Sequence, residues 1–151
     1  MKIYYREKSG GIEILRCFGI EGRVEIPGMI DGKLVISAAP YAFSSHMDEK
    51  EELKNASLWE VSDGLGFGRE EHVLAGNDVE EIVFPYTLKE IGRYIFYGCG
   101  NLKKLEFSDS LMQIGCGAFT GCHALEKLTC SYETGERSQA LRKCWARCGR
   151  G

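Results

Sequence analysis

Residues 88–105 read LKEIGRYIFYGCGNLKKL, and residues 111–128 repeat the pattern 23 positions later as LMQIGCGAFTGCHALEKL. The series Leu, Ile, Gly, Phe, Gly, Cys, Leu, Leu recurs in step. A period in the twenties is typical of a solenoid, in which one repeat cannot bury its own apolar face and must stack on a neighbour. The repeat therefore predicts that Phe96 stacks on Phe119 and that parallel strands lie near residues 80–84, 103–107 and 126–130.

A degenerate third copy occupies residues 35–46. There Tyr41-Ala42-Phe43 matches residues 94–96, and His46 takes the place of Cys99. The strand of this copy arrives late, at residues 79–84, which match residues 102–107 position for position. The step from Cys99 to Leu102 is 3 residues, whereas the step from His46 to Val79 is 33, so 30 residues are inserted at about positions 47–78.

The insert differs from the repeats in composition. From Asp48 to Asp78 it holds nine acidic and three basic residues, which favours a basic partner surface. Residues 49–59 are compatible with a short helix capped by Asp48, although their apolar periodicity is weak. We therefore expect the insert to bury little apolar surface and to pack loosely at one edge. Insertions in solenoids often carry binding specificity, and a decorated surface loop explains the same sequence equally well.

The two ends of the chain depart from the repeat. Residues 1–34 are interpreted as an N-terminal strand cap, with a half-buried β-hairpin that turns at Lys8-Ser9-Gly10-Gly11. Residues 129–151 are interpreted as a helical cap or tail, because Leu141, Cys144, Trp145 and Cys148 share one helical face. The expected organisation is a single domain over residues 1–151, a β-rich solenoid with short helices in the insert and at the C-terminus.

Composition restricts the class of protein. The 151 residues are 44% hydrophobic and 27% charged, and the net charge of −3 argues against a general nucleic-acid binder. No apolar run approaches the roughly 20 residues of a membrane helix, and the charged residues 1–8 lack the apolar stretch of a secretory signal. Together with the odd count of seven cysteines, this favours reduced thiols in a cytoplasm. A secreted or cell-surface location is the alternative.

The repeat resembles the BspA-type leucine-rich repeat of bacterial and protozoan proteins. Residues 114–128, IGCGAFTGCHALEKL, are a near-complete copy of its pattern, and residues 24–35, VEIPGMIDGKLV, are similar to its frequent lead-in. The resemblance covers residues 24–46 and 79–128. It implies a right-handed solenoid with a mostly parallel sheet on one face. It also implies relatives that are often secreted or attached to the cell surface, some of them adhesins for host proteins.

Cysteine positions allow two interpretations. Cys99 and Cys122 occupy one repeat position on adjacent coils, where strand spacing of about 4.8 Å makes a disulfide sterically conceivable. A ladder of small buried thiols is favoured, because Cys is among the most buried residue types. Cys144 and Cys148 with His123 or Cys130 could hold zinc, but a second matched pair is missing.

Neither a catalytic site nor a cofactor site is indicated. The three histidines stand in no catalytic motif and are expected to be solvated; they are His46, His72 and His123. The sequence therefore predicts no catalytic residue, no cofactor and no metal.

Strand alternation predicts one candidate protein-binding face. Leu102, Leu105 and Phe107 should point inward. The outward positions of three neighbouring strands are then Glu81, Val83, Lys104, Glu106, Lys127 and Thr129. Mixed charges of this kind are also compatible with simple solvation.

The sequence favours a non-catalytic protein–protein interaction module whose protein partner it cannot name. Neither nucleic acid nor a membrane is expected as a partner, and the solenoid ends offer a route to self-association. The alternative is a cell-surface or secreted adhesin-like fragment. A cysteine-dependent hydrolase is the third hypothesis, which an unusually low thiol pKa would favour.

Overall fold

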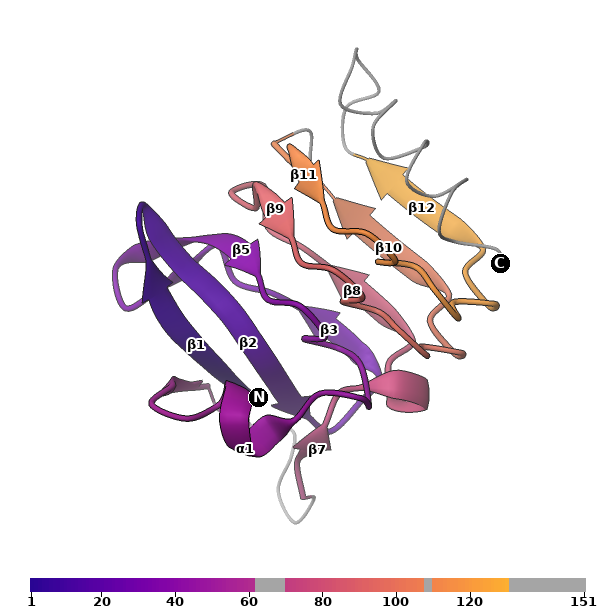
Figure 1. Cartoon of the computed structure of the whole chain (residues 1–151), viewed down its shortest axis with the longest axis horizontal. Coiled ribbons are helices and arrows are strands. Elements are labelled where there is room, and N and C mark those ends of the chain that lie inside the picture. The colour runs from indigo at the N-terminus through magenta and orange to yellow at the C-terminus, as the bar shows by residue number, and fades with distance from the viewer. Residues whose placement is uncertain (62–69, 108–109, 131–151) are drawn as a thin grey trace.

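The computed structural model describes residues 1–61, 70–107 and 110–130, with residues 127–130 described by their backbone alone. Most of the regular structure in these ranges is β-strand, arranged as two sheets. Figure 1 shows them as two layers that run from the β1–β2 hairpin at one end to β12 at the other. The described helices are short: α1 (Glu49–Glu52) and the 3₁₀ helix η1 (Gly76–Asp78).

Four parallel strands form the first sheet, which we call the repeat sheet. They are β3 (Arg23–Glu25), β8 (Glu81–Val83), β10 (Lys104–Phe107) and β12 (Lys127–Cys130), in the order β12-β10-β8-β3. Leu105 pairs with Leu128 on one side and Ile82 on the other, an offset of 23 residues each way. The predicted parallel strands are confirmed. β3, which the sequence assigns to the N-terminal cap, is a fourth member of this sheet.

The second sheet, which we call the mixed sheet, has the order β11-β9-β5-β2-β1-β6, with β4 paired to β5 and β7 paired to β2. Its strands are β1 (Lys2–Lys8), β2 (Gly11–Gly19), β4 (Met29–Ile30), β5 (Lys33–Ala38), β6 (Ser57–Glu60), β7 (His72–Val73), β9 (Glu90–Ile91) and β11 (Gln113–Ile114). β2, β5, β9 and β11 run parallel to one another, so the hairpin continues the same stack that the repeats build.

The predicted hairpin at the N-terminus is confirmed. β1 and β2 pair antiparallel from Lys2 opposite Phe18 to Lys8 opposite Gly11. The expectation that the hairpin is half-buried is wrong for β2, because Glu13 and Arg16 on its second face are also buried. Other parts of the chain lie over that face, as described below, and they satisfy both charges.

The described parts of the insert, residues 47–61 and 70–78, contain strands that the sequence did not suggest. The expected helix begins at Glu49 with Asp48 as its N-cap, as predicted, but its extent to residue 59 is wrong. α1 ends at Glu52, Asn55 adopts a positive φ of 63°, and β6 follows. β6 pairs antiparallel with β1, which places Trp59 against the core and leaves Leu58 exposed. For the described residues 72–74 the expectation of loose packing is also wrong, because β7 pairs with β2 and Leu74 is fully buried. Pairing with the open edge of the hairpin outweighs the weak helical preference.

Three equivalent segments link the two sheets. Residues 37–46, 90–99 and 113–122 are here named the first, second and third coils. Ser37 pairs with Glu90 and Glu90 with Gln113, so the three coils are in register along the stack. The segment at residues 35–46, in which the sequence places a degenerate copy, thus pairs in the same stack despite its separation by the insert.

A phenylalanine ladder fills the space between the sheets. The rings of Phe43 and Phe96 stack at 6.0 Å between centroids, and those of Phe96 and Phe119 at 5.8 Å. All three side chains are fully buried. The predicted stacking of Phe96 on Phe119 is confirmed, and Phe43 extends it into the first coil.

The repeated cysteine forms a second ladder along the stack. The Cys99 thiol donates to the carbonyl oxygen of Phe43 at 3.1 Å, and the Cys122 thiol donates to that of Phe96 at 3.3 Å. Both cysteines are free and buried, which confirms the interpretation as buried thiols. His46, at the equivalent position of the first coil, is exposed and packs its ring against Tyr97.

Candidate protein-binding face

The outward positions of the repeat sheet fall into two rows. In the first row Glu81, Lys104 and Lys127 are in register, and in the second row Val83, Glu106 and Thr129 are in register. The structure therefore brings all six predicted residues onto neighbouring strands. For Lys127 and Thr129 it describes the backbone pairing alone.

β3 adds two residues to these rows that the sequence prediction omitted. Arg23 pairs with Glu81 and continues the first row, while Glu25 pairs with Val83 and continues the second. The alternation Val24-Glu25-Ile26, followed by a proline as in Phe84-Pro85, is the sequence signal that could have identified them. From the sequence alone, this segment is equally compatible with a place in the N-terminal strand cap.

The face carries charges of both signs. Lys104 and Glu106 are exposed, and Glu81 and Val83 are half-buried. Arg23 lies 3.4 Å from Glu81 and 3.8 Å from Glu25, so its charge is partly neutralised within the face. Solvent-exposed pairs of this kind contribute little to stability, about 0–1 kcal/mol each. The charges of this face therefore add little to the stability of the fold.

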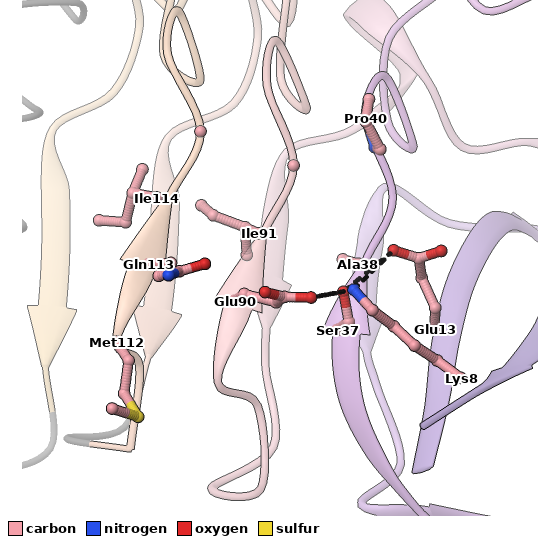
Figure 2. A pocket seen from close by; sticks show the side chains of 12 residues that line it. Lys8, Glu13, Ser37, Ala38, Pro40, Glu90, Ile91, Met112, Gln113 and Ile114 are labelled. Atoms are coloured by element: carbon pink, nitrogen blue, oxygen red, sulfur yellow. Dashed lines mark hydrogen bonds and ion pairs between the residues drawn. The ribbon is translucent and has the colours of Figure 1, made fainter. Parts of the chain in front are cut away.

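A groove of about 620 Å³ crosses the outer surface of the mixed sheet. Figure 2 shows its floor, where Glu13 of β2, Ser37 of β5, Glu90 of β9 and Gln113 of β11 follow one another across the strands. The pairing register links each of these residues to the next. This polar row was not predicted, because its members come from strands whose pairing only the fold reveals.

Internal contacts account for the charges in the groove. The Ser37 hydroxyl lies 3.1 Å from a Glu13 oxygen and 3.2 Å from a Glu90 oxygen, and the Lys8 ammonium contacts both carboxylates. The hydrogen bond from Lys8 holds the pKa of Glu90 below its ordinary value, and the same bond raises the pKa of Lys8. This network joins the hairpin to the second coil, so its first role is structural.

Three of the described thiols are poorly suited to act as nucleophiles. Burial raises the pKa of Cys17 and Cys122 to about 12, and burial also raises that of Cys99. A thiol that holds its proton so firmly is a poor nucleophile. His46, His72 and His123 are exposed, as predicted. The candidate zinc ligands Cys144 and Cys148 lie outside the described residues, within which no group of three metal-binding side chains occurs.

Parallel strands one repeat apart, with inward Leu, Ile and Phe side chains, define a leucine-rich repeat protein. The model of the BspA type leucine rich repeat region (6 copies) matches residues 70–146, and the chain belongs to that family. The match includes the second and third coils. It leaves out the first coil, which nevertheless stacks in the same register.

Three solved structures match the chain, and the first of them resembles it in fold. A leucine rich cell surface protein from Faecalibacterium prausnitzii is 18% identical, with a TM-score of 0.55 over 84% of this chain, which spans 30% of that protein's length. The Leucine Rich Repeat protein of T. pallidum is 21% identical, with a TM-score of 0.34 over 93% of this chain and 92% of its own. The pneumococcal vaccine antigen PcpA is 21% identical, with a TM-score of 0.42 over 87% and 37%. No curated protein has a significantly similar sequence.

Within the described part of the chain, no helix has the length and apolar character needed to cross a membrane.

Proposed function

We propose that this chain is a non-catalytic protein-interaction module that contacts its partner through the outward face of the repeat sheet. One observation carries the proposal. Arg23, Glu81 and Lys104 stand in register on one row, and Glu25, Val83 and Glu106 stand in register on the next.

This geometry suits recognition of another protein surface. Neighbouring strands hold successive side chains about 4.8 Å apart, and the backbone hydrogen bonds fix their positions before binding. A preorganised face loses less conformational entropy on association than one built from loops. Charges of both signs select partner and orientation more than they add affinity. A partner with a complementary pattern of charges is therefore favoured over a uniformly charged polymer.

We further propose how the chain is divided. Residues 1–151 form one leucine-rich-repeat domain, wound as a right-handed solenoid. Residues 1–34 are its N-terminal cap, 35–46 and 79–128 its repeats, 47–78 an acidic insert, and 129–151 its C-terminal cap or tail. Self-association through the ends of the stack remains part of this proposal, and so does a contribution of the acidic insert to binding a basic surface.

A second candidate is an adhesin-like role at the cell surface. It is favoured by the similarity in fold to the cell surface protein from Faecalibacterium prausnitzii. Protease treatment of intact source cells, followed by detection of this chain, distinguishes a location at the cell surface from one in the cytoplasm. Degradation of the chain in intact cells supports the surface, and protection until lysis supports the cytoplasm.

Photo-crosslinking tests the proposed face. A benzophenone amino acid at Val83 or Glu106 should capture the partner in source cells, whereas the same probe at Leu58, exposed on β6, should not. With the captured partner purified, the double variant Lys104→Glu/Glu106→Lys should weaken binding by about tenfold. Equal capture from Leu58, or unchanged affinity of the double variant, would show that the partner binds elsewhere.

A further inference from the structure

The coils are joined by a regular set of backbone hydrogen bonds. The N–H groups of Tyr41 and Phe43 in the first coil donate to the carbonyl oxygens of Arg93 and Ile95 in the second, at 3.2 and 3.0 Å. The same pattern recurs one coil later, where Tyr94, Phe96 and Gly98 donate to Cys116, Ala118 and Thr120 at 3.0–3.1 Å. Each coil thus satisfies carbonyl groups of the coil that follows it.

The first coil has no coil before it to do this. By the register, its carbonyl groups equivalent to those of Arg93, Ile95 and Tyr97 belong to Pro40, Ala42 and Ser44. Buried carbonyl groups without a donor cost about 1–3 kcal/mol each. The end of a repeat stack therefore needs donors from some other part of the chain.

The side chain of Arg16 donates to two of these carbonyl groups, those of Ala42 and Ser44, and to the neighbouring one of Tyr41. Its Nη1 atom lies 3.1 Å from the carbonyl oxygen of Tyr41, 3.2 Å from that of Ala42 and 2.6 Å from that of Ser44. The Tyr41 and Ser44 carbonyl groups also accept from the N–H groups of Ser44 and Met47, at 2.9 and 3.4 Å. Arg16 comes from β2, the strand of the hairpin that pairs with β5 of the first coil. Its side chain is 3% exposed, so water does not compete for these bonds.

The insert supplies the charge that makes this possible. A buried guanidinium is costly unless it is paired. Glu49, the first residue of α1, accepts a hydrogen bond from Arg16 Nε at 3.1 Å. Glu49 itself is partly exposed, which keeps its own desolvation cost low. Burial lowers the pKa of Arg16, and the Glu49 carboxylate opposes that shift.

We propose that Arg16 closes the stack by standing in for the backbone N–H groups of an absent coil, and that Glu49 holds it there. This assigns the start of the acidic insert a conformational task that is separate from any part in partner binding. The device is local: one cation from the hairpin, three carbonyl groups of the first coil and one carboxylate from the insert.

Hydrogen exchange followed by mass spectrometry on the full chain tests the proposal. In Arg16→Met, amide exchange over residues 41–47 should accelerate by at least about tenfold, while the second and third coils keep their protection. Glu49→Gln retains the three carbonyl contacts and should accelerate exchange there by a smaller factor. Arg23→Met, which removes an exposed arginine from the repeat sheet, is the matched control and should leave residues 41–47 unchanged.

Arg16→Lys keeps the experiment decisive if Arg16→Met does not fold. An ammonium can still donate to the carbonyl groups but cannot also present a separate Nε donor to Glu49. Arg16→Lys should therefore exchange faster than wild type over residues 41–47 and hardly respond to a second change, Glu49→Gln. Wild-type protection of residues 41–47 in Arg16→Lys, or loosening spread evenly over all three coils, would overturn the proposal.

Discussion

The first coil differs from the second and third at the positions that face the preceding coil. Gly92 and Gly115 lie so close to the coil before them that an added Cβ would come within 2.3 and 2.2 Å of backbone atoms. The first coil has Ala39 at this position. Cys99 and Cys122 donate to the preceding coil, and the first coil has His46 instead.

These differences share one physical cause. A residue that contacts a preceding coil must fit that backbone, so glycine and a small thiol recur in the inner coils. Where no coil precedes, the requirement disappears, and a methyl group or an exposed imidazole is accepted. The degenerate copy is thus the coil that adjoins the hairpin, and its departures from the pattern follow from that place. The following changes test this comparison, from the largest expected effect to the smallest.

Phe96→Ala should have the largest effect. The Phe96 ring contacts Phe43, Phe84 and Phe119, so truncation leaves a cavity in the centre of the core. We expect a loss of about 3–5 kcal/mol in the free energy of unfolding, measured by urea denaturation. Tyr86→Ala, at a side chain that is 76% exposed, is the control and should change stability by less than about 0.5 kcal/mol. A loss below roughly 1 kcal/mol for Phe96→Ala would contradict the buried ladder.

Gly92→Ala should cause the second-largest loss of stability, because the new methyl group would force apart the backbones of two coils. The Cβ would meet Pro40 N at 2.3 Å, and we expect a loss of about 1–3 kcal/mol. Gly28→Ala is matched to it, since its Cβ would meet Pro85 at 3.7 Å, an ordinary contact. Thermal melting should show Gly28→Ala to be near neutral. Equal melting temperatures for the two variants would sink the idea that close approach of the coils requires glycine.

Substitutions at Cys99 and His46 compare the same repeat position in the second and first coils. Cys99→Ala removes the thiol donor to the Phe43 carbonyl oxygen, which keeps its bond from the Gly76 N–H at 2.9 Å, so a loss of about 0.5–1.5 kcal/mol is expected. Cys99→Ser keeps a donor and should lose less. His46→Ala changes the same position in the first coil, where nothing precedes it, and should stay within about 0.5 kcal/mol of wild type. If His46→Ala costs as much as Cys99→Ala in chemical denaturation, the two positions do not differ as described.

The smallest effect is expected from acidification, which should remove the stability that the Lys8–Glu90 ion pair contributes between the hairpin and the second coil. Because Lys8 lowers the pKa of Glu90 in the folded state, the pair contributes stability above the ordinary value of 4.5, and this is lost as pH falls through the folded pKa. The pair is partly exposed, so the contribution is below about 1 kcal/mol. Denaturation between about pH 6 and pH 3 should show a shallower acid loss for Glu90→Gln. Parallel curves for variant and wild type would rule out the contribution.

The repeat made much of the fold predictable. Leu105, Phe96 and Cys99 recur at an offset of 23 residues, and the parallel register, the ring stacking and the buried thiols follow from that recurrence alone. The insert was harder, because residues 49–59 have neither a clear helical nor a clear strand period. Only the open edge of β1 made residues 57–60 a strand.

The candidate face was partly predictable for the same reason. Glu81, Lys104 and Lys127 occupy one repeat position, so their alignment could be read directly from the period. Arg23 lies outside the recognised repeats, and its alignment with Glu81 requires the pairing of β3 with β8. The groove lined by Glu13, Ser37 and Glu90 was beyond reach, since no period connects the hairpin to the coils.

By itself, the sequence determined the family, the stacking of the second and third coils, and which of their side chains are buried, because an internal repeat encodes contacts between its own copies. The tertiary structure decided what happens where the repeat stops. Whether Arg16 is a surface charge or a donor to carbonyl groups of the first coil depends on β2 lying beside β5 and on Glu49 reaching back from the insert. Such contacts join segments that share no pattern, so only the folded chain brings them together.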